Sequence, residues 1–240
     1  MVFSSVFFLF VFLPVTLAGY YVLRGKGRNY WLLLVSLVFF SWAQPQYAFL
    51  ITLSILLNYL SGLLVERLSL RGWSRYVLCL ALLLNIGILF YYKYYNFTVT
   101  TFNFFLQTQI PVREIILPIG ISFFTFQGMS YVIDISRSRV TAQKNIAKVG
   151  LYIALFPQLI AGPIVRYQDI RDEIERRTVN LSTFCDGIER FIIGLSKKAM
   201  IANSMAVTAD AVWSNVESGN LPPVAWIGSI AYTLQIYYDF

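Results

Sequence analysis

Histidine is absent from all 240 residues of this sequence, and cysteine occurs only twice. Without histidine, the chain cannot supply a Ser-His-Asp triad, an imidazole general base or most zinc sites. Cys79 and Cys185 lie far apart and match no metal-binding or redox spacing, so we interpret them as small buried hydrophobic residues. The sequence therefore predicts no metal site and no histidine-based catalytic site within this chain.

Charged residues are also scarce, at 13% of the sequence, whereas 58% is apolar and 17% aromatic. With a mean hydropathy of +0.63, this composition is typical of a polytopic membrane protein and not of a soluble domain. The net charge of +7 comes from short basic clusters between apolar runs, which indicates membrane topology and no binding of nucleic acid. We predict a single all-α integral-membrane domain over residues 1–240, with seven to eight hydrophobic helical segments in membrane lipid.

Five apolar runs predict membrane-spanning helices, at about residues 3–23, 29–43, 46–65, 76–95 and 115–135. The second run ends in a turn at Gln44-Pro45-Gln46. Lysine and arginine gather in every second gap between the runs, beginning with residues 24–28. Because cytoplasmic loops are rich in these residues, the alternation predicts a multi-pass protein of the cell (inner) membrane with its N-terminus outside.

The next apolar segment, residues 155–167, is too short and too broken to span a bilayer. Two prolines, a glycine and a glutamine leave backbone groups that lipid cannot satisfy, so the segment should be buried in protein or line a cavity. Both of its flanks are basic, which favours a re-entrant loop, although a tilted pair of half-helices is the alternative. The candidates for a substrate passage here are Pro157, Gln158, Gly162, Pro163 and Arg166.

A mixed-charge stretch at 169–177 predicts a solvated cytoplasmic helix. The following amphipathic helix should begin at Thr183, with Asp186 three residues later as in a helix N-cap. We expect this amphipathic helix to lie along the cytoplasmic interface or to line a cavity.

Two carboxylates fall at membrane depth, where charge is costly and usually either paired or functional. Asp134 has Arg137 three residues on, which favours a structural role. In the last apolar run, 224–240, Gln235 and Asp239 share one face that should look inward, so both join the candidate substrate passage. The chain stops inside this run, which we interpret as truncation at the C-terminus of a longer protein.

Several sequence blocks, taken together and in order, resemble the alginate O-acetyltransferase branch of the membrane-bound O-acyltransferase (MBOAT) superfamily. The blocks are Trp42 to Pro45 followed by Asn58-Tyr59, Asn85-Ile-Gly, Tyr92-Lys-Tyr94, Leu117-Pro-Ile-Gly-Ile-Ser-Phe-Phe-Thr-Phe-Gln127, Ser130-Tyr-Val-Ile-Asp134, the Phe156 to Tyr167 segment, Gly194-Leu-Ser-Lys-Lys198 and Tyr232-Thr-Leu-Gln-Ile-Tyr-Tyr-Asp-Phe240. The resemblance covers essentially the whole chain and corresponds to the N-terminal part of such proteins.

This resemblance implies an acyltransferase that passes an acetyl or other acyl group from a cytoplasmic thioester donor, acetyl-CoA or an acyl carrier, towards an exported polysaccharide such as alginate. The acceptor would be a polysaccharide hydroxyl or a periplasmic acyl-accepting partner protein, with no bound cofactor. The hallmark histidine of the family lies beyond the final block, so the resemblance implies that this chain is inactive alone. A transporter and a non-catalytic membrane scaffold are the alternatives that the residues leave open.

Overall fold

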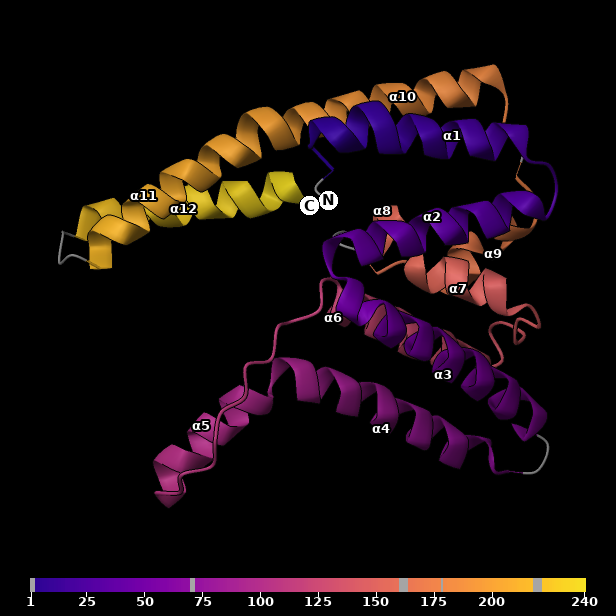
Figure 1. Ribbon diagram of the computed structural model, residues 1–240, viewed down its shortest axis with the longest axis horizontal. Coiled ribbons are helices and arrows are strands. Elements are labelled where there is room, and N and C mark those ends of the chain that lie inside the picture. The colour runs from indigo at the N-terminus through magenta and orange to yellow at the C-terminus, as the bar shows by residue number, and fades with distance from the viewer. Residues whose placement is uncertain (1–2, 70–71, 160–163, 178, 218–221) are drawn as a thin grey trace. The chain divides into compact units, whose positions relative to one another are not determined.

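The computed structural model describes residues 3–69, 72–159, 164–177, 179–217 and 222–240, and these form helices joined by loops, with no strand among them (Figure 1). The all-α prediction is confirmed. The chain divides into two compact units, which are described separately: Leu13–Arg176, and a second unit that joins the segment ending at Phe12 to Arg177–Phe240.

The first unit contains nine α-helices and a short 3₁₀ turn, η2, among its described residues. They are α1 (Leu13–Val22), α2 (Gly27–Ala43), η2 (Pro45–Tyr47), α3 (Ala48–Arg67), α4 (Ser74–Lys93), α5 (Tyr95–Leu106), α6 (Ile121–Ser136), α7 (Ile146–Ala154), α8 (Phe156–Leu159) and α9 (Tyr167–Glu175). Helix α3 packs against α4, α6 and α7, and α7 also packs against α2. The core of this unit therefore lies between α2, α3, α6 and α7.

Small residues let α3 and α6 approach each other closely. A Cβ on Gly62 of α3 would lie 2.8 Å from the Tyr131 ring of α6, and a Cβ on Gly128 of α6 would lie 2.3 Å from the Asn58 amide of α3. Asn58 in turn exchanges two hydrogen bonds with Asn85 of α4, at 3.2 and 3.1 Å, in a fully buried setting. Close backbone contact and a paired amide are the usual means by which helices associate in lipid.

Two helices are long and apolar enough to cross a membrane, Pro45–Arg67 and Ser74–Lys93, and Phe8–Val22 is a shorter apolar helix. The described residues therefore do not confirm the predicted seven to eight segments. Large apolar side chains nevertheless cover the outside of these helices; Leu83 of α4 is 67% exposed, for example. Such faces are stable where lipid covers them, which fits a membrane protein.

The predicted run 115–135 is wrong at its beginning, because α6 starts only at Ile121. Residues 113–118 form no helix, and the side chain of Gln44 binds the chain just before α6. Its amide donates to the carbonyl of Leu117 at 3.2 Å, and its carbonyl accepts the Ile119 N–H at 2.8 Å. The predicted turn at Gln44 is confirmed, and it serves to fix this distant segment.

In the second unit, α10 (Leu181–Ser196), the π-helical turn η4 (Lys197–Ala202) and α11 (Asn203–Glu217) follow one another as a continuous rod, and α12 (Pro222–Asp239) packs along α11 (Figure 1). The predicted cap at Thr183 is wrong. Helix α10 begins two residues earlier, because Asn180 accepts the Thr183 N–H at 2.8 Å and Thr183 returns a bond to the Asn180 backbone, forming a capping box.

Candidate functional site

The apolar segment after α7 is broken where the sequence predicts. Helix α7 ends at Ala154, Leu155 leaves helical geometry with ψ at 115°, and a single short helical turn, α8, follows over Phe156–Leu159. Val149 and Leu151 to Ala154 are fully buried, so α7 enters the interior of the first unit. Within the predicted segment itself the placement is mixed: Phe156, Leu159 and Tyr167 are buried, whereas Pro157, Ile164 and Arg166 are exposed. The predicted burial in protein therefore holds only in part.

Every backbone donor at the start of α8 is satisfied without lipid or water. The Phe156 N–H donates to the hydroxyl of Ser36, 120 positions away on α2, at 3.3 Å. Pro157 has no N–H to satisfy, and the Gln158 N–H donates to the carbonyl of Leu155 at 3.0 Å. A broken helix needs such partners to persist in a membrane, and Ser36 is a site component that sequence patterns did not indicate.

Gly120 lies directly against the end of α8. It has a φ of +71°, and a Cβ placed on it would lie 2.3 Å from the carbonyl oxygen of Leu159, the last residue of α8. Only glycine combines this left-handed backbone with so close an approach of another backbone. Gly120 belongs to the Leu117 to Gln127 block of the family resemblance, so the sequence contains a motif that could have pointed to this position.

Two glutamine side chains meet beside the break. The amide nitrogen of Gln127 on α6 lies 3.4 Å from the side-chain oxygen of Gln158 on α8. Gln127 is 1% exposed, and its own side-chain oxygen has no hydrogen-bond partner among the described residues. A buried amide oxygen left unpaired is costly, so it is an available acceptor for a hydroxyl or amide donor.

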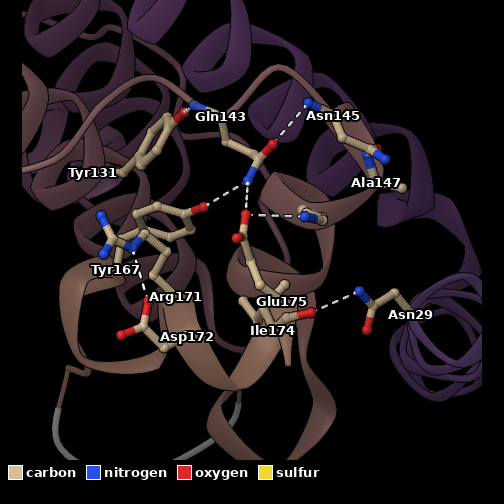
Figure 2. A network of polar contacts seen from close by, with 11 residues as sticks. Asn29, Tyr131, Gln143, Asn145, Ala147, Tyr167, Arg171, Asp172, Ile174 and Glu175 are labelled. Carbon is tan, nitrogen blue, oxygen red and sulfur yellow. Dashed lines mark hydrogen bonds and ion pairs between the residues drawn. The ribbon is translucent and has the colours of Figure 1, made fainter. Parts of the chain in front are cut away.

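The chain doubles back after the break, so that its two flanks meet. The Tyr152 hydroxyl of α7 donates to the carbonyl of Val165 at 2.9 Å, just before α9 begins. Gln143, which precedes α7, donates its side-chain amide to the Tyr167 hydroxyl at 3.1 Å and to Glu175 at 3.3 Å (Figure 2). The described flanks of the break are therefore held against each other within the first unit.

Charge and hydrogen bonds fix α9 in this returned position. Lys148 of α7 donates to Glu175 at 3.0 Å. Asn29 of α2 donates to the carbonyl of Ile174 at 2.9 Å (Figure 2). The hydrogen bond and positive charge of Lys148 lower the pKa of Glu175 below its ordinary value. The carboxylate is therefore held in its charged form.

Acid is expected to loosen α9. A lowered folded-state pKa gives Glu175 a stabilising contribution that is fully present above the ordinary glutamate pKa, about 4.3, and is lost as the pH falls through the lowered value. Because the side chain is 45% exposed, we expect less than about 1 kcal/mol, or a two- to fivefold loss of hydrogen-exchange protection in α9, between about pH 6 and pH 3.

The matched comparison for this pH effect uses Glu175→Gln and Glu173→Gln, since Glu173 is exposed on the same helix. Glu175→Gln should lower the hydrogen-exchange protection of α9 already at pH 6, and should remove most of the pH dependence of that protection. Glu173→Gln should retain the wild-type profile. Equal profiles for the two variants would contradict the role of Glu175.

The predicted passage residues of the first unit differ in their placement. Gln158 is half-buried and contacts Gln127, whereas Pro157 and Arg166 are exposed. Arg166 is the residue just before α9 and makes no capping hydrogen bond with its side chain. Gly162 and Pro163 lie outside the described residues. The geometry thus brings Gln158 together with Gln127, which the sequence reasoning did not single out.

In the second unit, Gln235 and Asp239 are half-buried on α12. Asp239 forms an ion pair with Lys198 of η4, another interaction that sequence reasoning missed. Both partners belong to blocks quoted for the family resemblance, but nothing in their spacing indicates that they meet. An ion pair between helices is the usual way in which a carboxylate is tolerated at membrane depth.

Two sequence-based expectations, one about cysteine burial and one about the partner of Asp134, need correction. Cys79 and Cys185 are exposed, not buried, because they lie on outward helix faces. Asp134 pairs with Arg139 at 3.6 Å and not with Arg137, because the helix ends at Ser136 and the chain turns at Ser138 with φ of 55°. Among the described residues no group of three or more histidine, cysteine or acidic side chains could hold a metal ion.

No family model matches the chain, but its whole length aligns with longer bacterial proteins. It is 38% identical over 247 residues to the probable alginate O-acetylase AlgI of Azotobacter vinelandii, covering 100% of the chain and 49% of that protein. It is 39% identical over 247 residues to the protein of the same name from Pseudomonas putida, covering 50% of it. A Helicobacter pylori peptidoglycan O-acetyltransferase is 30% identical over 272 residues, covering 100% of the chain and 51% of that protein.

An all-helical fold with apolar outer faces and a broken segment after α7 fits a membrane protein. The chain belongs to the membrane-bound O-acyltransferase superfamily, and within it to the branch of the alginate O-acetylases. It spans about half the length of the curated relatives it matches.

Proposed function

We propose that the protein containing this chain transfers an acetyl or other acyl group to hydroxyls of an exported polysaccharide such as alginate. The observation that carries this proposal is the similarity of the entire chain to proteins named as alginate O-acetylases and a peptidoglycan O-acetyltransferase. A Bacillus subtilis teichoic acid D-alanyltransferase, 26% identical over 75% of the chain, points to the same reaction class.

In the proposed reaction, the acceptor hydroxyl oxygen attacks the thioester carbonyl, the thiolate leaves, and the hydroxyl proton passes to a general base. This chain has no histidine to serve as that base. Its own contribution would be to shape the passage in which donor and acceptor meet. The orphaned oxygen of Gln127 supports this role, since it can accept a hydrogen bond from an acceptor hydroxyl or from the amide of a pantetheine arm.

The donor in this scheme is a cytoplasmic thioester, acetyl-CoA or a loaded acyl carrier, and the acceptor is the polysaccharide or a periplasmic partner protein that relays the acyl group. A donor and an acceptor on opposite sides require a protein open to both. A proline-broken element between helices can form a wall of such an opening, because its backbone is satisfied by protein and not by lipid.

The orientation is tested by labelling single cysteines with an impermeant reagent. With the N-terminus outside, cysteines at Gln46 and Thr101 should react from outside the inner membrane, and cysteines at Ser69 and Thr141 should not. In the proposed re-entrant topology both ends of the broken segment lie on the same side, so a cysteine at Gln168 should behave like the one at Thr141. External labelling at Gln168 would contradict a re-entrant loop.

The passage is tested by acyl transfer per folded molecule, measured on the protein that contains this chain. Gln158→Ala and Asp239→Asn should each lower transfer by about tenfold, the typical effect of losing one positioned polar contact. Matched controls are Gln168→Ala on α9 and Asp210→Asn on α11, both exposed. If activity and folded yield fell in parallel, these side chains would serve only to hold helices together.

A further inference from the structure

A second polar feature of the first unit is a cavity of about 250 Å³ at the end of α3. Its lining is mostly hydroxyl and guanidinium groups: Ser69, Ser74, Ser136, Ser138, Arg139 and Arg171. These residues come from the turn after α3, the start of α4, the end of α6, the loop after α6, and α9, which are separated along the sequence. The tertiary fold, and no local motif, therefore assembles this pocket.

The pocket lies where the two candidate membrane-spanning helices meet. Pro45–Arg67 ends beside it with Glu66, and Ser74–Lys93 begins in it with Ser74. The ends of spanning helices lie at the membrane surface, whichever side that is. A ligand in this pocket would thus sit at the level of the lipid headgroups.

Among the residues that line the pocket, positive charges outnumber negative ones, which favours an anion. Arg139 and Arg171 both remain partly exposed, and their partners Asp134 and Asp172 each meet them through one oxygen, at 3.6 and 3.1 Å. Glu66 is the carboxylate in the lining, and it accepts the N–H of Ala142 at 3.0 Å, which offsets part of its charge. The lining residues themselves are two arginines and one carboxylate, a net charge of +1, and the aspartates Asp134 and Asp172 that pair with the arginines lie outside the lining.

The hydroxyls add neutral donors to this positive lining. Ser69 already donates to the carbonyl of Glu66, but Ser74, Ser136 and Ser138 make no hydrogen bond through their side chains to another described residue. Ser138 has a φ of 55°, a conformation that favours glycine at a helix C-terminus. A serine there gives the pocket a hydroxyl at the cost of backbone strain, which is characteristic of ligand sites.

We propose that this pocket binds a phosphate group. Guanidinium forks surrounded by hydroxyls match the tetrahedral oxygens of a phosphate monoester or diester, and arginine is well suited to binding them in pairs. Two sources can supply the phosphate: an anionic lipid headgroup at the membrane surface, or a soluble phosphate compound. The shared chemistry is the phosphate oxyanion, and the sources are separated by experiment.

The test uses the full chain in lipid nanodiscs and follows its thermal unfolding. One arm adds inorganic phosphate at constant ionic strength to nanodiscs of phosphatidylcholine; the other replaces part of the phosphatidylcholine by phosphatidylglycerol. Stabilisation by free phosphate assigns a soluble ligand, and stabilisation by phosphatidylglycerol alone assigns a lipid headgroup. Both support a phosphate site, provided that the pocket arginines are required.

Arg171→Gln and Arg139→Gln should each weaken the apparent affinity about tenfold or more, the usual effect of losing a charge-assisted hydrogen bond. Arg137→Gln is the matched control, because it removes the same charge from the same loop but does not line the pocket. Arg139→Lys, which keeps the charge beside Asp134, separates loss of binding from loss of folding. No stabilisation in either arm, or equal losses in Arg137→Gln and Arg171→Gln, would overturn the proposal.

Discussion

Gly120→Ala is expected to destabilise the first unit by about 2–4 kcal/mol and to displace the broken segment, which is the largest effect we expect of any single methyl group here. The left-handed φ of +71° accounts for about 1 kcal/mol of this cost. The remainder comes from the new Cβ, 2.3 Å from the Leu159 carbonyl oxygen, which cannot move without moving α8. Chemical unfolding in detergent micelles measures the loss.

Gly25→Ala separates the two contributions. Gly25 has a φ of +55°, but a Cβ added to it would meet nothing within 4 Å, so it carries the conformational cost alone. It should cost only about 1 kcal/mol. Equal losses of unfolding free energy for Gly25→Ala and Gly120→Ala would contradict the close contact between Gly120 and α8.

Gly128→Ala is expected to cost about 2 kcal/mol by forcing apart the Asn58–Asn85 pair. The added Cβ would lie 2.3 Å from the Asn58 side-chain nitrogen, so the amide must leave its buried position and give up its bonds to Asn85 and to the Ser54 carbonyl. Interhelical hydrogen bonds in membranes contribute about 0.6 kcal/mol each, up to about 1.7, and loss of close packing between α3 and α6 adds to this.

A double-mutant cycle with Asn58→Ala tests this mechanism. Once Asn58 is shortened, the extra methyl group at position 128 has room, so Gly128→Ala should cost about 1 kcal/mol less in that background. Gly87→Ala is the control, since a Cβ there meets nothing within 4 Å and alanine favours a helix. Additive losses from the two substitutions would contradict a steric contact between these positions.

The sequence alone was sufficient for features that depend on one residue and its neighbours. The helical class follows from composition, and the break near Pro157 follows because proline lacks an N–H whatever surrounds it. The turn at Gln44-Pro45 was correct for the same reason. Helix beginnings were less well determined. Helix α6 starts at Ile121 because Pro118 and Gly120 interrupt the apolar run, and α10 is capped by Asn180 and not by the predicted Thr183.

Only the tertiary structure decided which polar groups, far apart in the chain, bind one another. Ser36 binds Phe156, Gln44 binds Leu117 and Ile119, and Lys198 binds Asp239. Periodicity shows that a residue faces inward. It cannot show which side chain that residue contacts, because the contact depends on how the helices pack. The sequence by itself thus determined where this chain is helical and where it breaks, whereas packing determined which buried donors and acceptors satisfy one another and which, like the Gln127 oxygen, stay without a described partner.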